Sequence, residues 1–267
     1  MKTILVATDY SKAANNALHY AANLAAVFGA KIELFNAFKI STHALNGLAS
    51  SASIDHMNDQ KRKQLEDLAN QTASNYHLTV TAICEMGNAE DLMVNHINHT
   101  SPDLVVLGME SNVLAYEWFG NTTTALIKAL NVPILVVPNE VPYESIDRIV
   151  FAYDPKFVNG SNEFLSLKEI TNQYNAKLEV FHVNTAKNKQ VVSGHNVETV
   201  LEDVSYVYHE VEGENIPESI AQEVVNFGAD LLVMVPHKPS FFESLTIAST
   251  TRKFALRSRI PLLILPN

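Results

Sequence analysis

Short apolar runs alternate with longer amphipathic stretches along the whole chain. The runs are rich in Val, Ile and Leu, which is typical of parallel strands buried on both faces of a sheet. In the first half they predict strands near 3–8, 31–38, 78–84, 103–107 and 133–137. In the second half they predict strands near 148–153, 177–183, 204–211, 230–235 and 261–265. We therefore expect a sheet in each half.

The amphipathic stretches between these runs predict helices. The first begins behind Ser11, a residue type that caps helix N-termini, and its apolar stripe consists of Ala14, Leu18, Ala21, Ala22 and Ala25. Further helices are expected near 56–75, 88–100, 122–130, 158–175, 194–203, 215–228 and 247–258. This alternation predicts an α/β fold with two tandem, open, parallel five-stranded sheets, right-handed crossovers and helices on both faces.

The two halves also resemble each other in sequence. "KTILVATDYS" (2–11) is similar to "DRIVFAYDPK" (147–156), and "GAKIELFNAF" (29–38) is similar to "NAKLEVFHVN" (175–184). Two later pairs follow in the same order: "PDLVVLG" with "ADLLVMV", and "VPILVVP" with "IPLLILP". Fewer residues separate the two members of these later pairs than separate those of the first two pairs. The pattern predicts a tandem duplication with domains 1–140 and 146–267, the second one shortened in its middle.

Two stretches interrupt the repeat. Residues 139–145, "NEVPYES", contain Pro142 and are interpreted as a short linker. Residues 41–53, "STHALNGLASSAS", are small and polar, which predicts a loop.

Composition and charge indicate which kinds of binding surface and which cellular location to expect. The chain has 267 residues, 47% of them hydrophobic, and a net charge of −10, which argues against a nucleic-acid surface or an anionic-membrane surface. The first residues do not form a signal peptide, and no run approaches a membrane span. Cys84 is the only cysteine, and it is interpreted as a buried strand thiol. We expect a cytoplasmic protein.

Chemistry should gather where the strands end, because open parallel sheets bind ligands beyond the carboxyl ends of their strands. The first strand ends at Asp9, which could bind a ligand or help to cap the next helix. The fourth ends at Gly108, and "GNTTT" (120–124) leads into a helix. That segment fits either a helix cap or a phosphate-binding turn.

These features together resemble the universal stress protein family. The five-element plan, Asp9, Gly108, the Gly-polar-Thr at the start of the last helix and the closing "PILVVP" carry the resemblance. A two-copy chain of this length resembles the tandem members, and "MVPHKPSFFESLTIASTTRKFA" resembles that stretch in tandem proteins of Bacteroidetes-like bacteria. The family fold is Rossmann-like, of the adenine-nucleotide α-hydrolase-like type.

Some members of this family bind ATP, and those carry Gly-x-x-Gly, nine residues, then Gly-Ser or Gly-Thr. Here the first Gly matches Gly108, Ser111 replaces the second, and the spacing to Gly120 is one residue short. In the second half the spacing is kept, but Val235, Lys238 and Ala248 replace the glycines. A side chain at such a position obstructs the approach of a pyrophosphate.

The resemblance implies a nucleotide site in the first half, for ATP (with Mg²⁺) or AMP. Adenine would lie near Asp9 and Ala37, and ribose and phosphates near Gly108 and Met109. The phosphates would lie at Gly120, Asn121 and Thr122, and Thr8 and Thr123 complete the candidate set. The equivalents in the second half, where binding is less expected, are Asp154, Val183, Val235, Ala248, Ser249 and Thr250.

Three functions fit these residues. The first is a stress-response regulatory or sensor protein that binds an adenine nucleotide without turning it over. The others are an interaction module without nucleotide and a slow ATP hydrolase, for which Asp9 and Glu110 are the visible metal-binding acids. No catalytic or metal residue is nominated: His96 and His99, spaced i and i+3, are interpreted as solvated surface histidines.

The resemblance also implies how the domains assemble. In this family the fifth strands commonly pair two domains, so "PILVVP" and "PLLILP" are expected to join the halves into an intrachain pseudo-dimer. A homodimer of two such chains and protein partners of unknown identity are further expectations.

Overall fold

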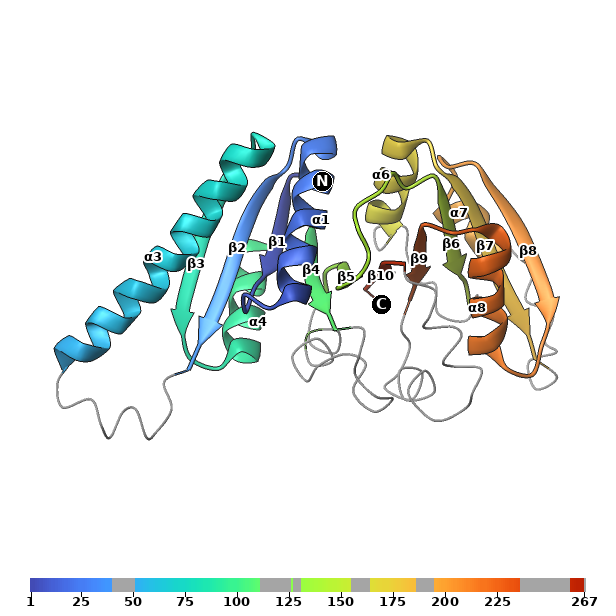
Figure 1. Ribbon diagram of the computed structural model, residues 1–267. Helices are drawn as coiled ribbons and strands as arrows, with labels where there is room; N and C mark the ends of the chain where they lie inside the picture. Colours follow the sequence, from blue (N-terminus) through green and yellow to red (C-terminus); the bar gives the residue numbers. More distant parts are fainter. Residues whose placement is uncertain are drawn as a thin grey trace.

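The computed structural model describes residues 1–39, 51–110, 126, 131–154, 164–185, 195–235 and 260–266. Figure 1 shows two similar groups of strands and helices side by side, one from each half of the chain. The strands of the described residues all belong to one ten-stranded sheet, in the order β3-β2-β1-β4-β5-β10-β9-β6-β7-β8. Each half therefore contributes five strands.

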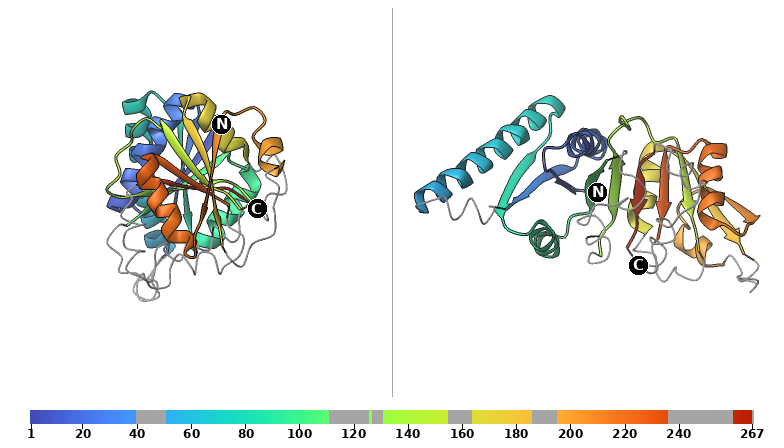
Figure 2. Two further views of the ribbon diagram at one scale, coloured as in Figure 1. Left: turned by 90° about the vertical axis from the view of Figure 1, so that its right-hand side faces the viewer. Right: turned by 60° about the horizontal axis from the view of Figure 1, so that its bottom comes forward.

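The sheet is parallel within each half. The first half supplies β1 (Thr3–Ala7), β2 (Lys31–Phe38), β3 (Val80–Met86), β4 (Leu104–Met109) and β5 (Ile134–Pro138). The second supplies β6 (Arg148–Ala152), β7 (Lys177–Asn184), β8 (Tyr206–Glu212), β9 (Leu231–Met234) and β10 (Leu262–Ile264). The halves meet where β5 and β10 pair in antiparallel fashion, with Leu135 opposite Leu263. The strands fan out along the sheet, as expected from the twist between neighbours (Figure 2).

Helices cover both faces of the first half. Helix α1 (Lys12–Phe28) and helix α3 (Ser51–Tyr76) lie on one face, and α4 (Ala89–Thr100) lies on the other (Figure 2). Ser11 caps α1 as predicted, because its Oγ accepts a hydrogen bond from the Ala14 backbone N–H at 3.1 Å. The second half has α6 (Leu165–Tyr174), α7 (His195–Val200) and α8 (Ile216–Phe227). No described helix is both long and apolar enough to cross a membrane.

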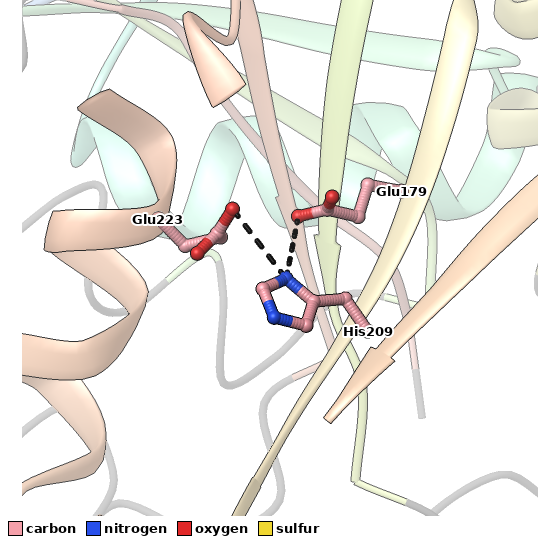
Figure 3. Close-up of side chains that lie close together, drawn as sticks. All are labelled: Glu179, His209 and Glu223. Atoms are coloured by element: carbon pink, nitrogen blue, oxygen red, sulfur yellow. Dashed lines mark ion pairs between the residues drawn. The ribbon is translucent and has the colours of Figure 1, made fainter. Parts of the chain in front are cut away.

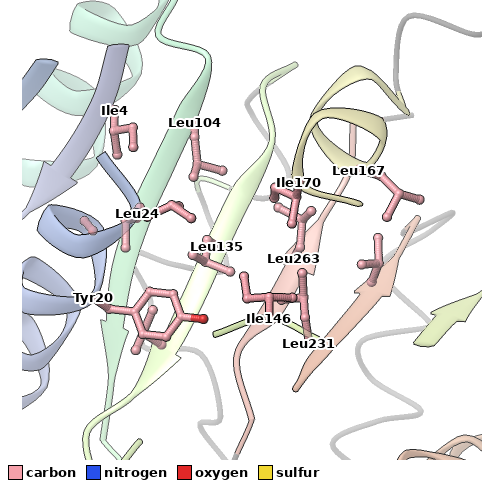
Figure 4. Packing of buried hydrophobic residues seen from close by; sticks show 14 of the residues in the cluster. Ile4, Tyr20, Leu24, Leu104, Leu135, Ile146, Leu167, Ile170, Leu231 and Leu263 are labelled. Atoms are coloured by element: carbon pink, nitrogen blue, oxygen red, sulfur yellow. The ribbon is translucent and has the colours of Figure 1, made fainter. Parts of the chain in front are cut away.

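One hydrophobic cluster runs through the join between the halves. It includes Leu24 and Leu135 from the first half and Ile170 and Leu263 from the second, all almost fully buried (Figure 4). Because these side chains pack across the β5–β10 pair, the two halves share a core.

The duplication is visible in single hydrogen bonds. In the first half, the Asp103 carboxylate accepts hydrogen bonds from the backbone N–H groups of Lys2 and Thr3, at 2.7 and 2.8 Å. In the second half, Asp230 accepts the same pair of bonds from Asp147 and Arg148, at 2.9 and 2.8 Å. In each half this aspartate ties the start of the first strand to the start of the fourth.

The predicted α/β architecture is confirmed, and the strand boundaries differ from the prediction by a few residues. The loop expected over 41–53 is wrong at its end, because helix α3 begins at Ser51; the rest of that loop lies outside the described residues. Cys84 lies in β3 as expected, but its side chain is only partly buried because β3 is an edge strand. The linker 139–145 contains no helix or strand. The helices expected at 122–130 and 247–258 lie outside the described part, except Leu126.

Candidate functional site

The strand order places the expected site between β1 and β4. The chain leaves β1 toward β2 on one side, and β4 lies on the other side of β1, so the order reverses there. Crevices at such reversals, beyond the carboxyl ends of the strands, are where open α/β sheets bind ligands. Asp9 follows β1, and Gly108 and Met109 end β4, so the structure brings these three candidates to the same edge of the sheet.

The end of β1 is held by local hydrogen bonds. Asp9 is exposed, and its Oδ1 accepts a bond from the Ser11 backbone N–H at 2.9 Å. Thr8 is buried, and its backbone oxygen accepts a bond from Asn36 Nδ2 at 2.7 Å. The Asp9 carboxylate therefore helps to shape the turn into α1, with Ser11 as the cap, and still faces solvent.

Gly108 lies against the first turn of α1. A Cβ at this position would be 2.4 Å from the backbone C and O atoms of Ala13 and 2.7 Å from the Ala14 N. Only a residue without a side chain lets the end of β4 approach the helix so closely. The packing against α1 is thus sufficient to explain why position 108 is a glycine, and a phosphate-binding role is not needed to explain it.

The remaining candidates of the first half fall into two groups. Ala37 in β2 and Met109 in β4 are partly buried and pack against one hydrophobic cluster, on the face of the sheet that α4 covers. Gly120, Asn121, Thr122 and Thr123 lie outside the described residues, as do Ala248, Ser249 and Thr250 of the second half.

The equivalent edge of the second half is built differently. The backbone N–H of Tyr153 donates to Phe181 O at 2.9 Å, as that of Thr8 donates to Phe35 O, so Tyr153 occupies the place of Thr8. Its aromatic ring is buried where the first half has a small hydroxyl, and burial raises the pKa of this phenol to about 12. Val235 follows β9 at the place of Gly108, and it packs against the core. The second edge therefore carries larger side chains.

Comparison with known proteins agrees with this doubled architecture. The sequence model of the universal stress protein family matches residues 1–138 and, separately, residues 146–266. The chain belongs to the universal stress protein family. It is a tandem member, with one copy of the family domain in each half.

Relatives of this tandem universal stress protein span its whole length. A universal stress protein of Synechocystis sp. is 26% identical over 290 residues, which cover 98% of this chain and 99% of the relative. A crystal structure of a universal stress protein from Archaeoglobus fulgidus DSM 4304 has a TM-score of 0.75 at 17% identity, covering 98% of this chain and 97% of that one. A functionally unknown protein from Pseudomonas aeruginosa PAO1 has a TM-score of 0.63 at 16% identity, covering 100% and 93%. At these identities the two structures show the fold alone.

The sequence-based interpretation of His96 in this stress protein was wrong. His96 is not a solvated surface histidine: its side chain is 14% exposed, and its Nε2 lies 3.0 Å from Glu33 Oε2 in β2. Lys31 Nζ binds the other oxygen of Glu33 at 3.1 Å. Burial alone would raise the pKa of Glu33, but the hydrogen bonds and charges of His96 and Lys31 outweigh it and lower that pKa. His99 is exposed, as expected.

The hydrolase interpretation depends on Asp9 and Glu110 as metal-binding acids. Glu110 is exposed after β4, and its Oε2 accepts a hydrogen bond from Asn139 Nδ2 at 2.7 Å. Asp9 already shapes the turn before α1. The two carboxylates are thus held by different segments of the chain, Asp9 at the start of α1 and Glu110 by the segment after β5.

Proposed function

We propose that this universal stress protein is a cytoplasmic regulatory module that binds an adenine nucleotide at the β1–β4 edge of its first domain and does not turn it over. The supporting observation is the pair of residues at that edge. An exposed carboxylate, Asp9, lies beyond β1, and a residue without a side chain, Gly108, ends the neighbouring β4. A carboxylate there can accept hydrogen bonds from a ribose hydroxyl or an adenine amine.

The difference between the halves makes the proposal specific to the first domain. At the equivalent edge of the second domain, Val235 replaces Gly108, and the Tyr153 ring replaces the Thr8 hydroxyl. Larger side chains leave less room for a nucleotide to approach the backbone. We therefore expect one nucleotide for each chain.

The role of the first domain would be to bind the nucleotide rather than to hydrolyse it. Asp9 and Glu110 are held by different parts of the scaffold, Asp9 by the Ser11 backbone N–H and Glu110 by Asn139. A sensor needs only that binding changes the protein, which requires no attacking water and no general base.

Calorimetric titration of the full-length chain, freed of co-purified nucleotide, with Mg-ATP and with AMP tests this function. We expect one site, no release of phosphate over hours, and binding about tenfold weaker in Asp9→Asn. Asp154→Asn, at the matching position of the second domain, is the control and should bind like the wild type. Gly120→Val should abolish binding.

A second function, an interaction module without nucleotide, is favoured by one observation. Gly108 is required by its contact with Ala13, so its presence does not need a ligand to explain it. Absence of binding by ATP and AMP at millimolar concentration would favour this function. Steady phosphate release that Asp9→Asn abolishes would favour the hydrolase instead.

A further inference from the structure

Two glutamates and a histidine meet beneath helix α8 in the second domain, away from the β1–β4 edge. Glu179 lies in β7, His209 in the edge strand β8, and Glu223 in α8 (Figure 3). The two glutamate side chains are almost completely buried, with 8% and 10% exposed, whereas that of His209 is 42% exposed. Their nearest ligand atoms all lie within 4.8 Å of one another.

Both carboxylates point at the same nitrogen. His209 Nδ1 is 3.8 Å from Glu179 Oε1 and 3.6 Å from Glu223 Oε1 (Figure 3). These distances exceed those of N–H···O hydrogen bonds. They are close to the separation of two ligand atoms that share a metal ion, which is roughly 3.4 Å for bonds of about 2.1 Å in a tetrahedral site.

One oxygen of the buried Glu179 carboxylate also lacks a hydrogen-bond partner among the described residues. Its Oε1 is inaccessible to solvent and has no hydrogen-bond partner in the part of the chain that the structure describes. Even with His209 protonated, two carboxylates and one imidazolium leave a net negative charge in a buried site. Such a charge is costly unless a proton or a cation neutralises it.

In the first domain, the glutamate at the position equivalent to Glu179 has a basic partner. Glu33 and Glu179 are equivalent, since they stand opposite Leu5 and Val150 in matching strand pairs. His96 and Glu223 are each the eighth residue of their helices, α4 and α8. Where the helix of the first domain presents a base to Glu33, the helix of the second presents another acid to Glu179, so the second copy has an excess of acidic groups that a bound cation would balance.

We propose that Glu179, His209 and Glu223 bind a divalent transition-metal ion of the Zn²⁺ or Mn²⁺ type. One imidazole nitrogen and two carboxylate oxygens suit these ions, whereas Ca²⁺ and Mg²⁺ prefer oxygen ligands alone. The exposed side of His209 leaves room for a water ligand. A bound ion would tie the edge strand β8 to β7 and α8.

Metal titration of the full-length chain tests this proposal, after treatment with chelator and gel filtration. Zn²⁺ should bind with a stoichiometry of one per chain, and Co²⁺ at the same site should give visible d–d absorption. Affinity should fall at least 100-fold in Glu223→Gln and in His209→Gln. His99→Gln, which removes an exposed imidazole from α4, is the matched control and should bind like the wild type.

Circular dichroism should show that the variants fold. If Glu223→Gln does not fold, His209→Gln still tests the proposal. We expect this variant to fold because His209 is partly exposed on an edge strand. The proposal is overturned if the wild type binds no stoichiometric Zn²⁺ below about 100 μM, a Kd equivalent to roughly −5.5 kcal/mol. It is equally overturned if both site variants bind as tightly as His99→Gln. Neither result bears on nucleotide binding, which the titration with ATP and AMP measures separately.

Discussion

Asn36 and His182 occupy equivalent positions in the two domains and make the same hydrogen bond. Asn36 Nδ2 donates to the backbone oxygen of Thr8 at 2.7 Å, and His182 Nδ1 lies 2.9 Å from the backbone oxygen of Tyr153. Because a carbonyl oxygen only accepts, His182 Nδ1 is the donor of this bond, while Nε2 of the same ring lies 3.2 Å from Asn184 Oδ1. Each side chain thus holds the end of its domain's first strand to the second strand.

This equivalence predicts that the two residue types are exchangeable. His182→Asn should preserve the hydrogen bond and leave the free energy of unfolding within about 0.5 kcal/mol of the wild type. His182→Leu should cost about 1–3 kcal/mol, because the Tyr153 oxygen loses its side-chain partner. Urea denaturation of both variants measures the difference, and equal stabilities would show that the hydrogen bond is unimportant.

Gly108→Ala should destabilise the first domain by about 2–3 kcal/mol, because the new Cβ would collide with the backbone of Ala13 rather than with a movable side chain. Gly29→Ala is the control. Nothing lies within 4 Å of a Cβ there, and only the positive φ of 63° is strained, at about 1 kcal/mol. Thermal or urea unfolding should rank the variants in this order, and the reverse order would contradict the packing role of Gly108.

The ion pair of Glu33 should make stability depend on pH in the acid range. Since Lys31 and His96 lower the pKa of Glu33 below its unfolded value of about 4.3, its stabilising effect is complete above that value and is lost as pH falls through the folded pKa. The stability difference between the wild type and Glu33→Gln should therefore shrink as the pH falls from 6 to 3. Urea titrations at several pH values check this, and a constant difference would contradict it.

Replacement of Glu223 should have opposite effects with and without metal. Burial and, after it, the charge of Glu223 raise the pKa of Glu179, so the two acids oppose each other in the metal-free protein. With chelator at pH 7.5, Glu223→Gln should be more stable than the wild type by roughly 1 kcal/mol, because an amide can donate to Glu179. With excess Zn²⁺ only the wild type should gain stability, and thermal shift measures both conditions.

The shared core predicts that the chain unfolds as one unit. Leu263 is fully buried opposite Leu135 at the join, so Leu263→Ala should cost about 2–5 kcal/mol and separate the unfolding of the two domains. Leu34→Ala, equally buried in β2 but distant from the join, should cost a similar amount within a single transition. Calorimetry distinguishes one transition from two.

The fold was largely predictable from the sequence, because strands buried on both faces leave continuous apolar runs. The run at 31–38 gave β2 with its observed ends, and Ser11 gave the start of α1. The start of α3 was missed because "SSAS" (50–53) has turn-like composition, whereas Ser51 begins a long helix that also contains Ser53.

The charged clusters were missed for a different reason. Their members come from separate elements, so no local spacing connects Glu33 with His96 or Glu179 with His209 and Glu223. A signal was present: "KIELF" and "KLEVF" each place a glutamate inside an apolar strand, at the same point of the repeat. A buried acid that recurs in both copies indicates a partner on the helix above it.

The antiparallel pairing of β5 with β10 joins two unlike domains of a single chain. Two separate domains would meet through such strands only at sufficient concentration, and each could pair with a copy of itself. Here the pairing is intramolecular, so dilution does not separate the unlike domains. Every molecule, however scarce in the cell, carries one domain of each kind in a ratio that expression level cannot alter.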